Sequence, residues 1–147
     1  MRFAVGQPVP RTEDPRLLTG NGQYTDDFSL PFQAYCHILR SPHAHAIIRS
    51  IDRSNAEAMP GVVAVLTGAD YAQDGIGEIT GGSPGQRRDG SVMYRPPRPA
   101  MTRDRVRHVG QSLALVVAET VNQAKDAAEA IMVDYADLPA HLSTADA

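Results

Sequence analysis

The chain has 147 residues, 42% of them hydrophobic and 21% charged, with a net charge of −3 at pH 7; this composition fits one folded domain, excludes a disordered chain and disfavours nucleic acid as a partner. Cys36 is the only cysteine, which excludes an internal disulfide and any metal site built mainly on thiolates. No apolar run approaches the roughly 18 residues that span a bilayer, and no signal peptide begins the chain, so we expect a cytoplasmic protein.

Residues 1–31 are rich in Gly, Pro, Asp and Thr, which predicts an extended N-terminal arm held by turns. Gly20-Asn21-Gly22 has the spacing that opens a dinucleotide-binding motif, but the third glycine of that motif would fall at Thr25. No strand precedes this stretch and no capped helix follows it, so we predict a plain turn. The acidic residues of the arm are predicted to bond to turn backbone rather than to form an acid/base pair: Asp14, Asp26 and Asp27.

The next stretch contains two apolar runs, Ala34–Leu39 and Ala46–Ile51, which predict two strands of one antiparallel pair. Ser54–Glu57 has the Ser-x-x-Glu spacing of a capping box, so a short helix should begin there. Pro60-Gly61 should end it, because proline lacks an amide hydrogen and glycine accepts a reversed backbone. Val62–Leu66 then predicts a buried strand.

Gly68–Arg105 is predicted to be a long exposed loop, because its Gly- and Pro-rich segments suit neither a helix nor a central strand. Gly81–Gly85 also lacks the Lys-Ser or Lys-Thr of a phosphate-binding loop. Loops longer than about 12–15 residues are commonly functional or shaped by a partner. This one and its flank are basic in an acidic chain, so two interpretations stay open, a solvated loop and a contact with an anionic partner surface; its arginines are Arg87, Arg88, Arg95, Arg98, Arg103, Arg105 and Arg107.

The last stretch carries the strongest local signals. Leu113–Ala118 predicts a buried strand, and Thr120–Gln123 predicts a capping box that opens the principal helix. Met132–Tyr135 and Leu142–Ser143 predict further short strands. We therefore expect an α+β domain, a mixed β-sheet with one principal helix and one short helix, the sheet being covered on one side by the helix near 120–131. The apolar face of that helix should consist of Val121, Ala124, Ala128 and Ile131.

His43 and His45 form an H-x-H pair, and alternate residues of a strand share a face, so they could bind one metal ion together. Nothing in the spacing indicates a third ligand, and we favour histidines that only form hydrogen bonds. Cys36 lies in an apolar run and is predicted to be a buried packing residue rather than a nucleophile. The residues themselves thus predict no catalytic, cofactor-binding or metal-ligating position.

Five segments, taken in order, resemble a known family. Arg11–Asp27 is similar to the opening of the large subunits of bacterial molybdenum hydroxylases, which include carbon monoxide dehydrogenases and related aldehyde and isoquinoline oxidoreductases. The other segments are similar to successive signatures of that family's alpha/beta hammerhead domain: Ser41–Ile48, Pro60–Asp70, Asp104–Thr120 and Asp126–Pro139. The resemblance implies an arm over 1–31 and a hammerhead domain over 32–147 with a long loop at 68–105. Gln111 departs from the pattern, where a glutamate is expected.

The resemblance implies the structural N-terminal domain of a molybdopterin-dependent oxidoreductase of the aldehyde oxidase, xanthine dehydrogenase and carbon monoxide dehydrogenase type. In such enzymes electrons pass from molybdenum through two iron–sulfur clusters to a flavin (FAD). The pterin-contacting loops and the glutamate base lie in later segments of the large subunit, so no catalytic position carries over and the isolated chain is expected to be inactive. If Met1 is the native start, iron–sulfur and flavin subunits are separate partners beside the molybdopterin-binding remainder. The alternatives are a free-standing partner-binding or assembly module and a small metal-binding protein using His43 and His45.

Overall fold

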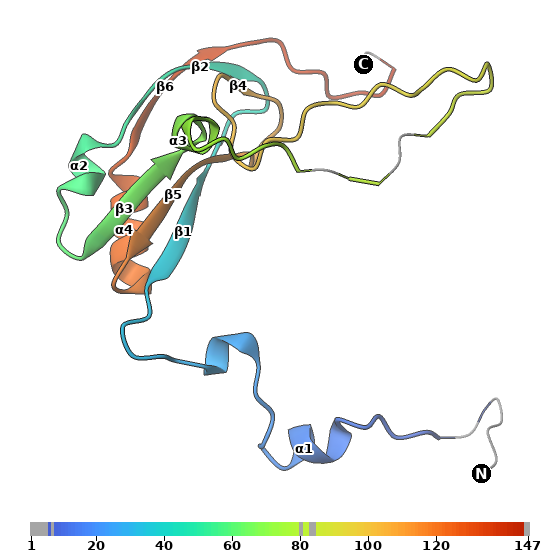
Figure 1. Cartoon of the computed structure of the whole chain (residues 1–147), viewed down its shortest axis with the longest axis vertical. Coiled ribbons are helices and arrows are strands. Elements are labelled where there is room, and N and C mark those ends of the chain that lie inside the picture. The colour runs from blue at the N-terminus through green and yellow to red at the C-terminus, as the bar shows by residue number, and fades with distance from the viewer. Residues whose placement is uncertain (1–5, 7, 80, 83–84, 146–147) are drawn as a thin grey trace. The chain divides into compact units, whose positions relative to one another are not determined.

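The computed structural model describes residues 6, 8–79, 81–82 and 85–145. The chain divides into two compact units, Met1–Gln33 and Ala34–Ala147 (Figure 1). The first unit contains one turn of helix, α1 (Asp14–Leu18), and a 3₁₀ helix, η1 (Thr25–Asp27), neither of which buries a residue. The second contains all the strands and the remaining helices. Among the described residues, no helix is long and apolar enough to cross a membrane.

Local hydrogen bonds shape the first unit. The Asp14 carboxylate accepts a bond from the backbone N–H of Arg11 at 3.2 Å, and the Asp27 carboxylate accepts one from that of Tyr24 at 2.8 Å. Gly20 has a φ of +74° and ends α1, because that reversed backbone lets Gly20 and the next residue bond to carbonyls of the last turn. The predicted turn at Gly20 and the turn-holding roles of Asp14 and Asp27 are confirmed.

The first sheet of the second unit has the order β1 (Tyr35–Arg40), β5 (Ser112–Ala118), β3 (Val62–Thr67), with both pairs antiparallel. Helix α4 (Val121–Glu129) packs against one face of this sheet (Figure 1). The buried positions of α4 are all alanines, which bring the helix close to the strands. The predicted cover of the sheet by this helix is therefore confirmed, although Val121 is exposed and Ala127 takes its place in the core.

The second sheet has the order β4 (Arg105–Val106), β2 (Ala46–Asp52), β6 (Met132–Asp137), and it is also antiparallel. Its core contains Ala46, Ile48 and Val106. Leu113 from β5 lies in the same cluster and is completely buried. This side chain therefore joins the first sheet to the second.

The α+β class is confirmed, but the arrangement of the strands differs from the prediction. Ala34–Leu39 does not pair with Ala46–Ile51, and the expected single mixed sheet is two antiparallel sheets. The connection between β1 and β2 is not a hairpin turn. Buried Ser41 exchanges backbone bonds with Gly110 at 2.8 Å and Gln111 at 2.9 Å, and these bonds lead the chain from one sheet into the other. The predicted strand at Leu142–Ser143 is wrong, since the described residues after β6 contain none.

The first residues of the helices confirm one predicted cap and contradict another. Thr120 caps α4 as predicted, because its hydroxyl accepts a bond from the backbone N–H of Gln123 at 3.2 Å. Helix α2 (Ser54–Glu57) is present, but Ser54 does not cap it; the Ser54 hydroxyl donates to Asp52 at 2.6 Å instead. Helix α3 (Gly68–Gln73) was missed, and it occupies the start of the stretch predicted as loop.

Candidate functional site

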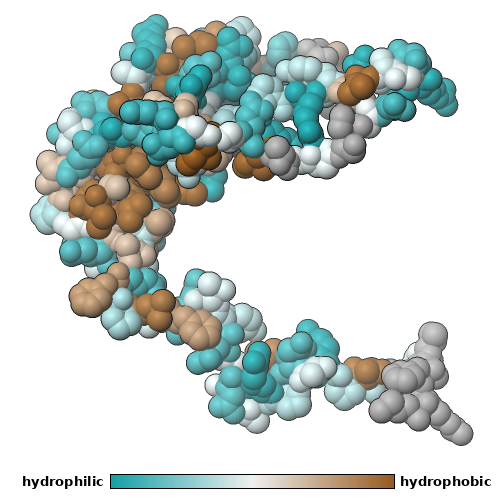
Figure 2. All heavy atoms as spheres, viewed as in Figure 1, coloured by the Kyte–Doolittle hydropathy of each residue, from teal (hydrophilic) through white to brown (hydrophobic). Residues whose placement is uncertain are grey.

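One face of the β1-β5-β3 sheet is apolar and partly exposed in the part of residues 34–147 that the structure describes. Helix α4 packs on the face that carries Ala114, Val116 and Ala118 of β5. The alternate residues point the other way, and the register aligns them in two rows across the three strands. Figure 2 shows the resulting apolar surface over these strands. We call this surface the open face; it consists of Cys36, Ile38, Ala64, Leu66, Leu115 and Val117.

The side chains of the open face are more exposed than is usual for apolar residues of a sheet. Ile38 retains 37% of its accessible surface, Cys36 is exposed, and the other members are half-buried. The prediction of a buried Cys36 is thus wrong. An apolar strand run indicates burial on both faces, but among the described residues of the second unit a helix packs on one face alone.

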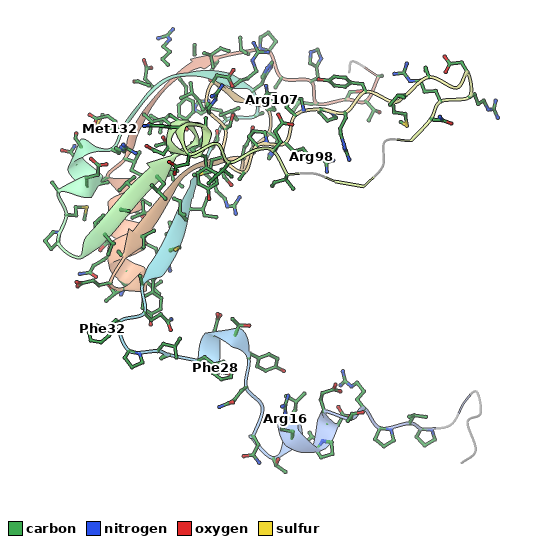
Figure 3. All side chains as sticks on the ribbon, in the orientation of Figure 1. Arg16, Phe28, Phe32, Arg98, Arg107 and Met132 are labelled. Carbon is green, nitrogen blue, oxygen red and sulfur yellow. The ribbon has the colours of Figure 1, made fainter. Side chains whose placement is uncertain are left out.

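The first unit presents a second set of apolar side chains. Leu18, Phe28, Leu30 and Phe32 are all exposed, Leu18 at 87%. Figure 3 shows Phe28 and Phe32 standing away from the ribbon. Phe32 also has a φ of +62°, a backbone conformation that costs a bulky residue about 1 kcal/mol or more. We call these four side chains the arm set.

The two histidines are brought near β6 but have separate partners. His43 Nδ1 lies 2.7 Å from a carboxylate oxygen of Asp137, and its ring centroid lies 4.3 Å from that of Tyr135. His45 Nδ1 lies 2.7 Å from the carbonyl oxygen of Pro139. The hydrogen-bonding roles favoured from the sequence are confirmed. Among the residues that the structure describes, no group of three His, Cys, Asp or Glu side chains could hold a metal ion.

Packing affects the pKa of Tyr135, whose ring lies beside that of His43. Burial raises the pKa of the Tyr135 hydroxyl, and a hydrogen bond with the Ser41 side chain opposes that effect. Ser41 itself bonds to the backbone of His43 rather than to its imidazole ring. The Ser41, His43 and Asp137 side chains therefore do not form the relay that would activate a serine nucleophile.

Arg53 makes a polar junction that was not predicted from the sequence. Its guanidinium donates to the carbonyl of Val65 at 2.8 Å and to the Asp70 carboxylate at 2.6 Å, and it pairs with Glu57 at 2.9 Å. Asp70 also accepts bonds from the backbone N–H and the hydroxyl of Thr67, at 2.6 and 2.8 Å. The junction joins α2, β3 and α3. The Thr-x-x-Asp spacing at 67–70 was the signal that could have revealed it.

These bonds set the protonation of Asp70. Burial by itself raises the pKa of this carboxyl, but the bonds from Thr67 and Arg53 together outweigh burial and leave the pKa below its ordinary value. A carboxylate so held remains charged and paired, so it is suited to structure rather than to proton transfer.

All seven arginines of the arginine-rich stretch are exposed. Among the described residues, none of its arginines forms an ion pair with a carboxylate; these are Arg87, Arg88, Arg95, Arg98, Arg103, Arg105 and Arg107. A cleft of about 350 Å³ lies between α3 and the segment 97–107. Tyr71, Ile76 and Met101 give it apolar walls, and Arg103 and Arg107 line it as well. Glu78 and Asp104 line it too, so its charged side chains are balanced and give no preference for an anion.

Comparison with known proteins identifies the family. The model of the family described as "Aldehyde oxidase and xanthine dehydrogenase, a/b hammerhead domain" matches residues 19–139. The chain belongs to this family. The resemblance stated from the sequence is thereby confirmed, and the hammerhead domain is one found in large subunits of molybdenum hydroxylases.

Individual relatives are similar over nearly the whole chain. The nicotine 6-hydroxylase large subunit of Paenarthrobacter nicotinovorans is 40% identical over 137 residues, which cover 93% of this chain and 16% of that protein. The carbon monoxide dehydrogenase large chain of Afipia carboxidovorans is 38% identical over 140 residues, 92% of this chain and 15% of that protein. The crystal structure of quinoline 2-oxidoreductase from Pseudomonas putida 86 superposes with a TM-score of 0.81 at 37% identity, covering 95% of this chain and 17% of that one. The chain thus spans less than a fifth of the length of these relatives.

Proposed function

We propose that this hammerhead domain is a folded support within the large subunit of a molybdopterin-dependent hydroxylase or dehydrogenase. It holds the molybdopterin-binding remainder of that subunit in shape and contributes no reacting group. Iron–sulfur and flavin subunits complete the enzyme, which we place in the cytoplasm.

The open face carries this proposal. A sheet needs a layer on each apolar face, and α4 supplies only one of them. Complete burial of a Val, Leu or Ile side chain contributes roughly 1.5–3 kcal/mol. Covering Ile38, Leu66, Leu115 and Val117, which are half-exposed, would therefore stabilise the domain by several kcal/mol. The relatives extend far beyond the matched segment, and the corresponding large-subunit remainder is the occupant that we assign to this face.

The arm set supports the same assignment. Phe32 keeps a strained backbone and a fully exposed ring, which is expected where the ring fits a partner. Obligate interfaces are rich in such apolar side chains and resemble a divided core.

The polar interior supports the absence of a cofactor from this domain. A buried pterin needs donors and acceptors that the protein holds ready for it. In the described part of the chain, every buried side-chain nitrogen or oxygen already has a hydrogen-bond partner. The buried polar groups therefore leave none free for a pterin, and we derive no catalytic step from them. In the intact enzyme their contribution is pre-organisation of groups carried elsewhere.

A charge on the open face tests the proposal. Ile38→Glu is introduced into the complete large subunit, with Met132→Glu as the control, because Met132 is exposed on β6 in the other sheet. We expect Ile38→Glu to lower both the yield of assembled subunit and its molybdenum content, while the control keeps both. Circular dichroism of the corresponding 147-residue chains checks that each variant still folds. Equal molybdenum content in both variants would contradict the proposed docking.

A second measurement tests the absence of chemistry. The purified 147-residue chain is assayed for dye reduction with aldehydes, purines, N-heterocycles or carbon monoxide, and we expect none. Turnover by this chain alone would overturn the proposal.

A further inference from the structure

The segment 85–98 is a short hairpin rather than an irregular loop. The backbone N–H of Met93 bonds to the Gly85 carbonyl at 3.0 Å, and that of Arg87 bonds to the Ser91 carbonyl at 2.9 Å. At its base the N–H of Ile79 bonds to the Arg98 carbonyl at 2.8 Å. We call residues 85–98 the basic hairpin. The bonds within 85–93 and the bridge between Gln86 and Val92 place the arginines of the tip and the apolar side chains of the stem on one element.

The tip of the basic hairpin is positively charged. Arg87 and Arg88 are exposed there, and neither pairs with a carboxylate among the described residues. The one acidic residue of the hairpin, Asp89, is engaged in the turn: its carboxylate accepts bonds from the Ser91 hydroxyl at 2.7 Å and from the Ser91 N–H at 2.9 Å. These bonds lower the pKa of Asp89. The hairpin contains four arginines and one aspartate, a net charge of +3 in a chain whose total is −3.

The stem beside this tip is apolar and aromatic. Val92, Met93 and Tyr94 are all exposed, Tyr94 at 77%. Tyrosine, methionine and arginine are the residue types enriched at the centres of protein–protein interfaces, and tyrosine and arginine dominate binding hot spots. The hairpin thus combines apolar side chains with unpaired cations on one ordered element.

We infer that the basic hairpin docks onto an acidic surface of a separately folded protein. The open face and the arm set are almost uncharged, as suits permanent burial within one polypeptide. The hairpin is charged, and it does not need permanent burial. Its arginines can remain hydrated before docking and then pair with carboxylates. A polynucleotide is disfavoured, since Tyr94 is the only aromatic side chain of the hairpin and the rest of the chain is acidic. This inference does not depend on the molybdenum assignment.

Photo-crosslinking in the cells that make the protein identifies the partner. Tyr94 is replaced in the full-length protein by the photoreactive p-benzoylphenylalanine, and adducts are mapped by mass spectrometry. We expect adducts to a distinct polypeptide, within or beside a segment rich in Asp and Glu. Adducts only to the same polypeptide, adducts to nucleic acid, or no adduct at all would each overturn the inference.

Charge reversal then tests the electrostatic part. Arg87→Glu/Arg88→Glu is compared with Arg49→Glu/Lys125→Glu, which changes the net charge equally at exposed positions outside the hairpin. We expect the hairpin variant to bind the crosslinked partner about tenfold more weakly per reversed arginine, and wild-type binding to weaken as salt is raised. Equal affinity of the two variants would overturn the inference. If molybdenum content stays normal while this binding is lost, the support role stands and the hairpin role is separate from it.

Discussion

The two faces of the β1-β5-β3 sheet are built by the same strands, yet one face is buried and the other is partly exposed. Val116 faces α4 and has no accessible surface, whereas Val117, the next residue, lies on the open face. Chemically the two faces are alike, so hydrophobicity does not separate them. One strand can thus supply both the core of a domain and an exposed apolar surface, and the covering layer decides which residue does which.

One charge placed on each face in turn tests the difference between the two faces most directly. Val116→Asp should prevent folding of the isolated chain, because an unpaired carboxylate among alanines costs at least about 3–5 kcal/mol. Val117→Asp should change the unfolding free energy by no more than about 1 kcal/mol, since its carboxylate remains in contact with water. Urea titration followed by circular dichroism measures both. Similar losses in the two variants would show that the open face is covered within the isolated chain.

Close packing at the end of β3 predicts a smaller loss. A Cβ on Gly68 would lie 2.5 Å from the Thr102 carbonyl oxygen, and backbone on both sides has little room to move. Gly68→Ala should therefore destabilise the domain by roughly 1–3 kcal/mol. Gly77→Ala is the control, because a Cβ there meets nothing within 4 Å. Thermal unfolding of both variants compares them, and equal melting temperatures would contradict this contact.

Substitution of Thr120, the N-cap residue of α4, tests the helix that covers the sheet. Thr120→Ala removes the acceptor for the Gln123 N–H, and we expect a loss of about 1 kcal/mol. Thr120→Ser keeps a hydroxyl and should recover most of it. Chemical denaturation is the measurement, and a serine variant as unstable as the alanine variant would assign the loss to the methyl group instead.

The Asp70 junction predicts the smallest effect, and one that depends on pH. The pKa of Asp70 is lowered in the folded chain, so its bonds stabilise the fold fully above the ordinary value of 3.8 and are lost as the pH falls through the lower, folded value. The wild-type chain should be more stable than Asp70→Asn at neutral pH, and the difference should shrink as the pH drops below 4. Melting temperatures measured between pH 3 and pH 7 test this, and a difference that grows on acidification would have the wrong sign.

Elements that depend on neighbouring residues were predictable. The capping signal at Thr120 and the apolar run over Leu113–Ala118 each describe interactions within a few residues, so they identified α4 and β5 correctly. The same local reasoning succeeded for the turn at Gly20. It failed at Ser54, where Asp52 lies close enough to take the hydroxyl that a capping box needs.

Partners distant in the sequence were not predictable. Nothing in Ala34–Leu39 says that it pairs with residues 112–118 rather than with the adjacent apolar run, because the choice depends on bonds of Ser41 to residues about 70 positions away. The candidate site was missed for the same reason, since the open face exists only once three strands are aligned and α4 has covered the other side.

The sequence by itself determined the α+β class, the main helix with its cap, the central strand and the family, because these follow from short-range patterns of side chains. Only the tertiary structure decided which strands pair, that Cys36 is exposed, and that one of the two apolar faces of the sheet stays partly exposed among the described residues. Burial belongs to the whole arrangement of layers, and a residue acquires it only when another element packs against it.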